Sequence, residues 1–242
     1  MASKKKAKKT EKKPEIRKTA KAAEPIITQA KRALPAVQKK MGDEKAYDLL
    51  KRYGIPLTHY SFAKSEKELL AALKKIGYPA IMKISGRSII HKTELGGIIT
   101  VSNEEEAKQA RKKLLAIGGV EKVLAQKKLE GIEVIVGAKR DPQFGAVVVF
   151  GFGGIYAEII KDVVFRICPI TPEDAEQMIK SVKGYEILAG ARGKPVNIEA
   201  LKDVLVKICR LASREGIREM DINPLFINEE GCRAADVRIV GK

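Results

Sequence analysis

The chain has 242 residues, enough for one large domain or two small lobes around a hydrophobic core. No apolar run is long enough to span a bilayer, so we expect no membrane-spanning segment. The formal net charge is +17, of which residues 1–25 carry +7 through nine lysines, one arginine and three glutamates. We expect residues 1–25 to form a basic, disordered tail.

The three cysteines, Cys168, Cys209 and Cys232, are far apart in the sequence, and no CxxC pair exists. This pattern indicates neither a disulfide framework nor a zinc site. The lysine-rich N-terminus has no apolar segment behind it, so the sequence shows no secretory signal. We therefore expect a cytoplasmic protein.

Up to about residue 122 the hydrophobic pattern alternates between helix and strand, which is typical of an α/β lobe. Capping-box spacing predicts two helix starts, one at Ser65 with Glu68 and one at Ser102 with Glu105. The expected elements are a helix within 27–56, a strand at 57–63, a helix at 65–77, strands at 78–85 and 96–102, and a helix at 102–118.

Beyond residue 122 the pattern predicts an antiparallel meander of three strands within 121–154, with a hairpin loop at RDPQFG. A short helix with Pro172 in its first turn follows, and then an amphipathic helix that ends at Gly216. Three further strands are expected, at 217–222, 224–228 and 232–240. The sequence therefore predicts an α/β (α+β) fold after the tail, with lobes at 26–122 and 123–242 and a ligand site between them.

Two features are candidate phosphate-binding elements. Lys83 has apolar neighbours, so strand alternation points it away from them, and a lysine that projects into a cleft can bind phosphate oxygens. A surface lysine on a half-buried strand is the alternative. The segment GFGGIYAE at 151–158 follows a valine-rich strand, and its glycines allow backbone N–H groups to approach a phosphate. Glycines also make ordinary turns, and the segment matches neither a Walker A loop nor a Rossmann fingerprint.

Two further features are a candidate metal site and a candidate nucleophile. Asp221 and Asn223 are two residues apart, so a strand places both on one face, and Asp236 follows on the next strand. Such oxygen ligands bind Mg²⁺ when water and phosphate complete the octahedron, and the alternative is a polar strand pair at the surface. His91 lies in SIIHKTELGG, whose two glycines indicate a mobile loop. A neutral imidazole attacks a γ-phosphoryl group well, although a lone histidine is often structural.

Six motifs occur in a characteristic order: YGIP, GYPAIMKIS, IIHKTELGG, KRDPQFG, GFGGIYAEIIKDVVFRICPI and EMDINPL. On these motifs, from about residue 40 onward, the chain resembles the β subunit of the archaeal ADP-forming (NDP-forming) acetyl-CoA synthetases, of the acyl-CoA synthetase superfamily. The resemblance implies a two-lobed ATP-grasp fold with the nucleotide site between the lobes. The run SGRS differs from the Ser-Pro-Asp-like run of the family, and the lysine-rich tail has no counterpart in the family pattern.

The resemblance also implies a role for each candidate residue. Lys83 would bind the α- and β-phosphates of ATP or ADP, or of GTP or GDP. His91 would become a phosphohistidine whose ring Asp221 orients. The other positions are Asn223 and Asp236 as Mg²⁺ ligands, Gln126 and Lys127 at the adenine, Glu133 at the ribose, and Gly153 and Gly154 near the phosphates.

The reaction implied by the resemblance is acyl-CoA + ADP + phosphate ⇌ acid + CoA + ATP, an acid–thiol ligation in reverse. In this scheme a histidine of a partner α subunit is phosphorylated first, and His91 relays the phosphoryl group to ADP. No sequence remains here for a CoA-binding domain, so we expect an α subunit that handles CoA, acetate and phosphate, in an α₂β₂ heterotetramer. The identity of the acyl-CoA and the choice between ATP and GTP stay open.

Two other functions are possible on the residues alone. A stand-alone ATP-grasp carboxylate ligase would form an acyl phosphate in its own site, but we find no third region for its substrate. A basic nucleic-acid-binding protein would depend on the tail alone, because no RNA- or DNA-binding motif is present.

Overall fold

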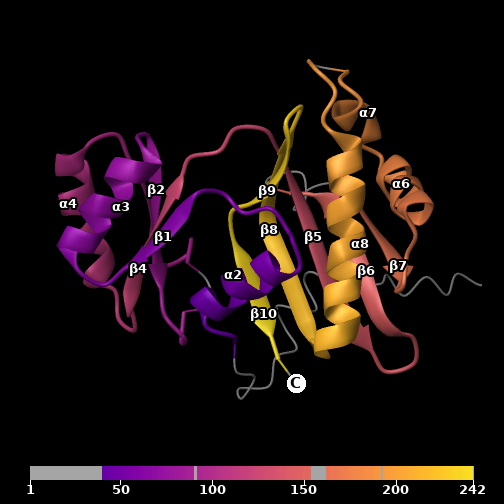
Figure 1. Cartoon of the computed structure of the whole chain (residues 1–242), viewed down its shortest axis with the longest axis horizontal. Coiled ribbons are helices and arrows are strands. Elements are labelled where there is room, and N and C mark those ends of the chain that lie inside the picture. Colours follow the sequence, from indigo (N-terminus) through magenta and orange to yellow (C-terminus); the bar gives the residue numbers. More distant parts are fainter. Residues whose placement is uncertain (1–39, 90–91, 154–161, 192, 242) are drawn as a thin grey trace, which may run out of the picture. The chain divides into compact units, whose positions relative to one another are not determined.

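The computed structural model describes residues 40–89, 92–153, 162–191 and 193–241. These residues belong to one compact unit, which spans Val37–Lys242. They form two antiparallel sheets, each with helices packed against it (Figure 1). The predicted tail at 1–25 lies outside the described residues, and so do two predicted site residues, His91 and Gly154.

The smaller sheet has four antiparallel strands in the order β1-β4-β2-β3. The strands are β1 (Tyr60–Ala63), β2 (Ala80–Ser85), β3 (Ile98–Val101) and β4 (Lys122–Lys127). Helices α3 (Glu66–Ile76) and α4 (Glu104–Leu115) pack against it. The core between them is a separate cluster of buried residues that includes Leu69, Met82 and Leu114.

The starts of both helices depend on side-chain caps. The predicted capping box at Ser65 and Glu68 is confirmed, because each side chain accepts a hydrogen bond from the other residue's backbone N–H. The predicted cap at Ser102 is wrong by one residue. Asn103 caps α4 instead, accepting from the backbone N–H of Glu106 at 2.9 Å, since an asparagine caps at least as well as a serine.

The larger sheet has six antiparallel strands in the order β10-β8-β5-β6-β7, with β9 paired to β8. The strands are β5 (Ile132–Asp141), β6 (Gly145–Phe152), β7 (Val163–Ile167), β8 (Glu219–Asn228), β9 (Gly231–Ala234) and β10 (Val237–Val240). The helices packed with it are α2 (Asp43–Arg52), α6 (Pro172–Ser181), α7 (Tyr185–Leu188) and α8 (Ile198–Glu215).

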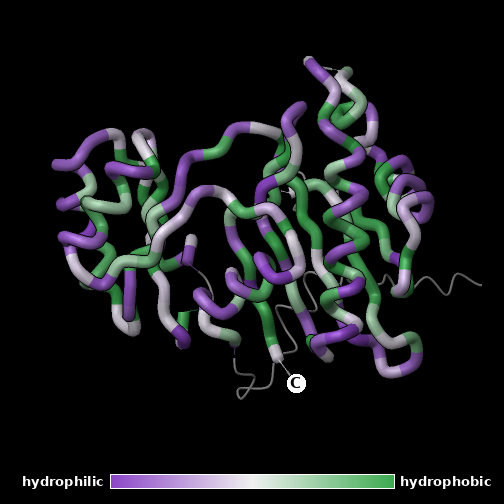
Figure 2. Tube along the Cα trace, viewed as in Figure 1, coloured by the Kyte–Doolittle hydropathy of each residue, from purple (hydrophilic) through white to green (hydrophobic). Residues whose placement is uncertain are grey.

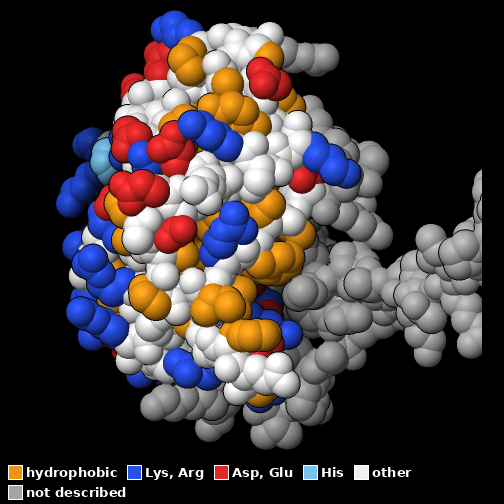
Figure 3. All heavy atoms as spheres, turned by 90° about the vertical axis from the view of Figure 1, so that its right-hand side faces the viewer, with side chains coloured by type: hydrophobic (Ala, Val, Ile, Leu, Met, Phe, Trp, Pro, Cys, Tyr) orange, Lys and Arg blue, Asp and Glu red, His pale blue; other side chains and the backbone are white. Residues whose placement is uncertain are grey.

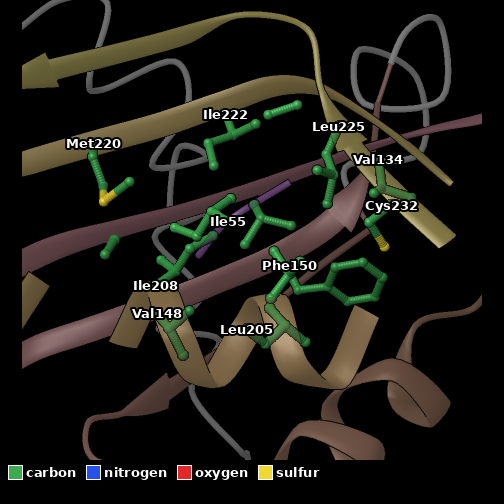
Figure 4. Packing of buried hydrophobic residues seen from close by; sticks show 14 of the residues in the cluster. Ile55, Val134, Val148, Phe150, Leu205, Ile208, Met220, Ile222, Leu225 and Cys232 are labelled. Carbon is green, nitrogen blue, oxygen red and sulfur yellow. The ribbon is translucent and has the colours of Figure 1, made fainter. Parts of the chain in front are cut away.

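Helix α8 forms much of the core of the larger sheet. Its hydropathy alternates along the helix, so that one side is apolar (Figure 2). Leu205 and Ile208 are fully buried and point toward Val148 and Phe150 of β6 (Figure 4). The predicted stop at Gly216 is confirmed, because this residue has the left-handed conformation, with φ of 62°, that glycine adopts without a steric penalty.

Strand pairing differs from the predicted meander in two ways. The expected first strand of the meander, β4, pairs with β1 and β2, and its residues Val123, Leu124 and Ala125 are buried because it is a central strand of the smaller sheet. The last strands are also divided differently: those expected at 217–222 and 224–228 form the single strand β8, and the one expected at 232–240 is split into β9 and β10. The division into lobes at residue 122 stays a prediction.

The face of the molecule in Figure 3 carries acidic and basic side chains interspersed with apolar ones. In this view many of the basic side chains lie along the left edge, with acidic side chains beside them in its upper part. Among the helices in the described part of the chain, none combines the length and the apolar character that a membrane crossing requires.

The expectation that the sequence holds no disulfide is wrong. Cys168, just after β7, and Cys209 of α8 form a disulfide, with their Cα atoms 5.6 Å apart. The two residues are 41 positions apart in the chain, so spacing alone gives no sign of the contact. Cys232 is a free thiol, and burial raises its pKa to about 12.

These cysteine environments predict how many thiols react with an aromatic disulfide reagent that releases one coloured thiolate for each free thiol. Protein purified without reductant should show no reactive thiol when native, because Cys232 is buried and protonated. It should show one thiol in denaturant and three after reduction. The variant Cys232→Ser should show none in denaturant before reduction. Three thiols in unreduced, denatured protein would contradict the disulfide.

Candidate functional site

The carbonyl oxygen of Ala235, in the link between β9 and β10, accepts two hydrogen bonds from distant parts of the chain. Lys83 Nζ, from β2, donates to it at 2.8 Å, and the hydroxyl of Tyr47, from α2, donates at 3.0 Å. The side-chain amide of Gln126, from β4, donates in turn to the Tyr47 hydroxyl at 2.9 Å. All three donors are buried, so this carbonyl joins both sheets and α2 in one polar network.

The next residue, Asp236, belongs to a buried cluster of charges. Lys92 Nζ lies 2.8 Å from Asp236 Oδ1 and 3.8 Å from Asp43 Oδ2. Lys40 Nζ lies 2.8 Å from Asp43 Oδ1 and also donates to the carbonyl of Ile89 at 2.7 Å. Together with Lys83, three ammonium groups face two carboxylates here, which leaves one net positive charge.

This cluster determines the protonation states of its members. Burial by itself would raise the pKa of Asp236, but the ammonium groups of Lys92 and Lys83 hold it below the ordinary value, so the group is a carboxylate. Burial would lower the pKa of Lys92, but Asp236 and Asp43 raise it above the ordinary value. For Lys83 burial prevails and its pKa is lowered, although Asp236 opposes the shift.

Asn223 and Asp236, the predicted metal ligands, lie next to each other. The backbone N–H of Asn223 donates to the carbonyl of Asp236 at 3.2 Å, and Ala235 N–H donates to the carbonyl of Pro224 at 3.1 Å. Asn223 is exposed and Asp236 is ionised, so the site has one amide oxygen and one carboxylate, the latter paired with Lys92 through Oδ1. This donor set fits Mg²⁺, which takes one or two carboxylates and fills its other positions with water and phosphate. Within the described residues no group of three or more His, Cys, Asp or Glu gathers as for a metal ion.

Asp221, predicted to orient a phosphohistidine ring, is already paired. Arg238 of β10 lies opposite it in register, and its Nε donates to Asp221 Oδ1 at 2.9 Å. The same guanidinium also contacts Glu219. Burial raises the pKa of Asp221, and Arg238 opposes this shift.

The predicted adenine positions adjoin a cavity of about 440 Å³, a volume within the usual range for small-ligand pockets. Lys127, Lys128, Tyr78 and Phe226 are among the residues that line it. The backbone N–H of Lys127 is bonded to the carbonyl of His59 at 2.9 Å, so this group is not free to bind a base. The side-chain amide of Gln126 donates to Tyr47 in the polar network, and Gln126 is not among the residues that line the cavity.

Glu133, the predicted ribose residue, and Gly153, predicted to lie near the phosphates, adjoin each other at the start of β5 and the end of β6. The N–H of Gly153 donates to the carbonyl of Glu133 at 2.8 Å. Glu133 is exposed and opposite Phe226 in register, so both side chains lie on one face of the larger sheet, beside the cavity. A Cβ at position 153 would lie 3.2 Å from the Glu133 backbone, which leaves little room there for any residue but glycine.

The structure therefore brings Lys83, Asn223 and Asp236 to one place, and Glu133 and Gly153 to another beside the cavity. Sequence reasoning missed Asp43, Tyr47 and Lys92, and with them the cluster around Asp236. No local signal in the sequence marks this cluster, because a lysine directly after His91 has no distinctive pattern. The roles of His91 and Gly154 stay predictions.

Comparison with known proteins identifies the family. The family model of the ATP-grasp domain matches residues 32–240. The β subunit of acetate–CoA ligase (ADP-forming) I from Pyrococcus furiosus is 46% identical over 229 residues, covering 90% of this chain and 97% of that subunit. Acetate–CoA ligase (ADP-forming) II from Archaeoglobus fulgidus is 44% identical over 194 residues, covering 79% of this chain but only 29% of that longer protein.

A solved structure of an acetyl-coenzyme A synthetase from Ca. Korarchaeum cryptofilum agrees with this result. It matches with a TM-score of 0.74 and 34% identity, covering 90% of this chain and 98% of that one. That protein is in complex with coenzyme A and Mg-AMPPCP, and its phosphohistidine segment points towards the nucleotide binding site. The predicted α/β fold of the ATP-grasp type is confirmed. This chain belongs to the ATP-grasp family and, within it, to the β subunits of the ADP-forming acetate–CoA ligases.

Proposed function

We propose that this chain is the nucleotide-binding subunit of an ADP-forming acyl-CoA synthetase. It transfers a phosphoryl group between a phosphohistidine and ADP, and so couples the cleavage of an acyl-CoA to ATP synthesis. The observation that carries this proposal is the meeting of Lys83, Asn223 and Asp236 around the link between β9 and β10. Sequence similarity to a β subunit that this chain matches over nearly the whole length of that subunit supports the same function.

The phosphates of the nucleotide would bind at the buried charge cluster. Lys83 donates one hydrogen bond to Ala235, and its ammonium has two more donors for phosphate oxygens. The one net positive charge of the cluster favours a polyanion over a neutral ligand. Asn223 and Asp236 would hold Mg²⁺, which when bound neutralises phosphate charge and orients the chain of phosphates.

The nucleoside would extend from this cluster toward the 440 Å³ cavity. Phe226 and Tyr78 give that cavity aromatic surface for a base, and Glu133 can accept hydrogen bonds from ribose hydroxyls. The N–H of Lys127 is bonded to His59 and that of Lys128 to Pro79, which favours contact of the base with the backbone at 129–131, between β4 and β5. Either adenine or guanine satisfies these contacts.

The chemical step moves one phosphoryl group without net hydrolysis. The bond between the imidazole nitrogen of phosphohistidine and phosphorus breaks, and a bond from the β-phosphate oxygen of ADP to phosphorus forms. His91 leaves as the neutral imidazole after taking up one proton. Little covalent chemistry is required of the protein, so its residues act by positioning and by neutralising charge.

The other substrates belong to a partner in this proposal. An α subunit carries the CoA-binding domain and its own phosphorylated histidine, and CoA, acetate and phosphate react there, in an α₂β₂ heterotetramer. A stand-alone carboxylate ligase is disfavoured because the matching Pyrococcus furiosus protein is a β subunit. A nucleic-acid-binding function has no support among the described residues, and a cytoplasmic location stays a prediction.

Lys83→Ala should weaken the binding of Mg·ADP by about 10- to 100-fold, the usual loss for one hydrogen bond to a charged group. Isothermal calorimetry on the complete chain measures this. Lys113→Ala is the matched control, because this lysine is exposed on α4 and removal of its charge should leave the affinity unchanged. If both variants bind like the wild type, Lys83 is not a phosphate ligand. If the wild type binds no nucleotide, alone or with an α subunit, the proposed function is wrong.

His91 should become labelled when the chain is incubated with Mg²⁺ and ATP that carries radioactive γ-phosphate. A phosphohistidine is labile in acid and stable in base, which distinguishes it from a phosphoserine. His91→Ala should lose the label but still bind ADP, because the imidazole is not a nucleotide ligand in this scheme. Lys113→Ala, which changes an exposed residue of α4, is the control and should keep the label. Equal labelling of the wild type and His91→Ala would exclude the relay.

A further inference from the structure

Lys92 forms an ion pair with Asp236, the carboxylate that the proposed function assigns as a ligand of a metal ion. Its Nζ lies 2.8 Å from Asp236 Oδ1, and only 6% of its surface is exposed. We propose that Lys92 is an internal counter-ion of Asp236, which a divalent cation must displace in order to bind there. The inference rests on the proposed function in one respect, namely that Asp236 is a metal ligand.

Asp43 is a second ion-pair partner for the ammonium of Lys92 when a cation displaces that ammonium from Asp236. The Asp43 residue is only 3% exposed, and neither of its oxygens has a well-aligned hydrogen bond within the described structure. Lys40 pairs with Oδ1 by charge, whereas Oδ2 faces Lys92 Nζ at 3.8 Å, too far for a hydrogen bond. Oδ2 is therefore the oxygen of this buried carboxylate that lacks a close partner, and a shift of Lys92 by about 1 Å toward Asp43 would supply one.

The turn that follows Lys92 is anchored to β2, so the side chain can move without it. The carbonyl of Lys92 accepts from Gly97 N–H at 2.8 Å, and the carbonyl of Gly97 accepts from Ile84 N–H of β2 at 2.9 Å. A Cβ at position 97 would lie 2.2 Å from Ile84 Cδ1, so the turn packs too closely against β2 for a side chain. The exchange of Lys92 between Asp236 and Asp43 is therefore a small rotation of one side chain.

This arrangement makes cation binding depend on the nucleotide. The cluster of Lys40, Lys83, Lys92, Asp43 and Asp236 already has one positive charge in excess, and a divalent cation alone would add two more. Phosphates that arrive with the cation compensate this charge. Lys92 thus acts through Asp236 as a positioning residue, which orients the carboxylate and competes with a free cation for it.

The test uses Mn²⁺ alone, without nucleotide, on the complete chain, with the electron paramagnetic resonance signal of the free ion as readout. Lys92→Gln should bind Mn²⁺ about tenfold more tightly than the wild type, in line with the coupling of close charge pairs. Lys92→Arg keeps the positive charge and should bind as weakly as the wild type. Lys108→Gln is the matched control, because it removes a half-buried surface lysine that also lies 2.8 Å from its acidic partner. Equal affinity of the wild type and Lys92→Gln would overturn the inference.

A double-mutant cycle tests the second position. Asp43→Asn should weaken Mn²⁺ binding by about threefold or more, because Lys92 then has no alternative to Asp236. The same substitution in the Lys92→Gln background should have no effect. If Asp43→Asn still weakens Mn²⁺ binding in the Lys92→Gln background, Asp43 acts only through its own charge. That result would overturn the exchange of Lys92 between Asp236 and Asp43. Thermal unfolding of each variant identifies any loss of the fold.

Asp236→Asn separates failure of this inference from failure of the proposed metal site. If Mn²⁺ binding in the presence of ADP is unchanged in Asp236→Asn, Asp236 is not a metal ligand and both ideas fail. If that binding is lost in Asp236→Asn, but Lys92→Gln does not tighten the binding of Mn²⁺ alone, the metal site stands and the counter-ion role of Lys92 is wrong.

Discussion

The carbonyl of Ala235 and the carboxylate of Asp236 receive donors from three other parts of the chain. Lys83 comes from the smaller sheet, Tyr47 from α2, and Lys92 from the turn after β2. Each donor is buried, and a buried donor without a partner costs free energy, so these contacts constrain the smaller sheet, α2 and the link between β9 and β10 together. The geometry of the candidate site is a consequence of this constraint.

Helix α2 connects the hydrophobic core with the charges of the site. Its residues Leu49 and Leu50 belong to the core of the larger sheet. Asp43 and Tyr47, one helical turn apart, face the cluster around Asp236, and burial together with the two carboxylates keeps the Tyr47 pKa well above its ordinary value. Tyr47 is therefore a permanent donor. A helix near the start of the described chain thus helps to position groups almost two hundred residues away.

Local features could be predicted from the sequence, and long-range partners could not. The capping box at Ser65 and the helix stop at Gly216 depend on neighbouring residues alone. The partner strands of β4, by contrast, depend on which surfaces the folded chain buries. The resemblance to a family indicated Lys83 and Asp236, because motif order carries that information. It gave no sign that Lys92 pairs with Asp236 across 144 residues, since a lysine beside a histidine has no distinctive pattern.

The central claim is that a nucleotide and a divalent cation bind together at Asp236 and Lys83. A crystal of the complete chain grown with Mn²⁺ and a non-hydrolysable ATP analogue tests it most directly, because the anomalous signal of manganese locates the ion. The account predicts a manganese peak in coordination distance of the Asp236 carboxylate and the analogue's phosphates, with the Lys83 ammonium on a phosphate oxygen. A manganese peak away from Asp236, or an analogue whose phosphates do not reach Lys83, would contradict it.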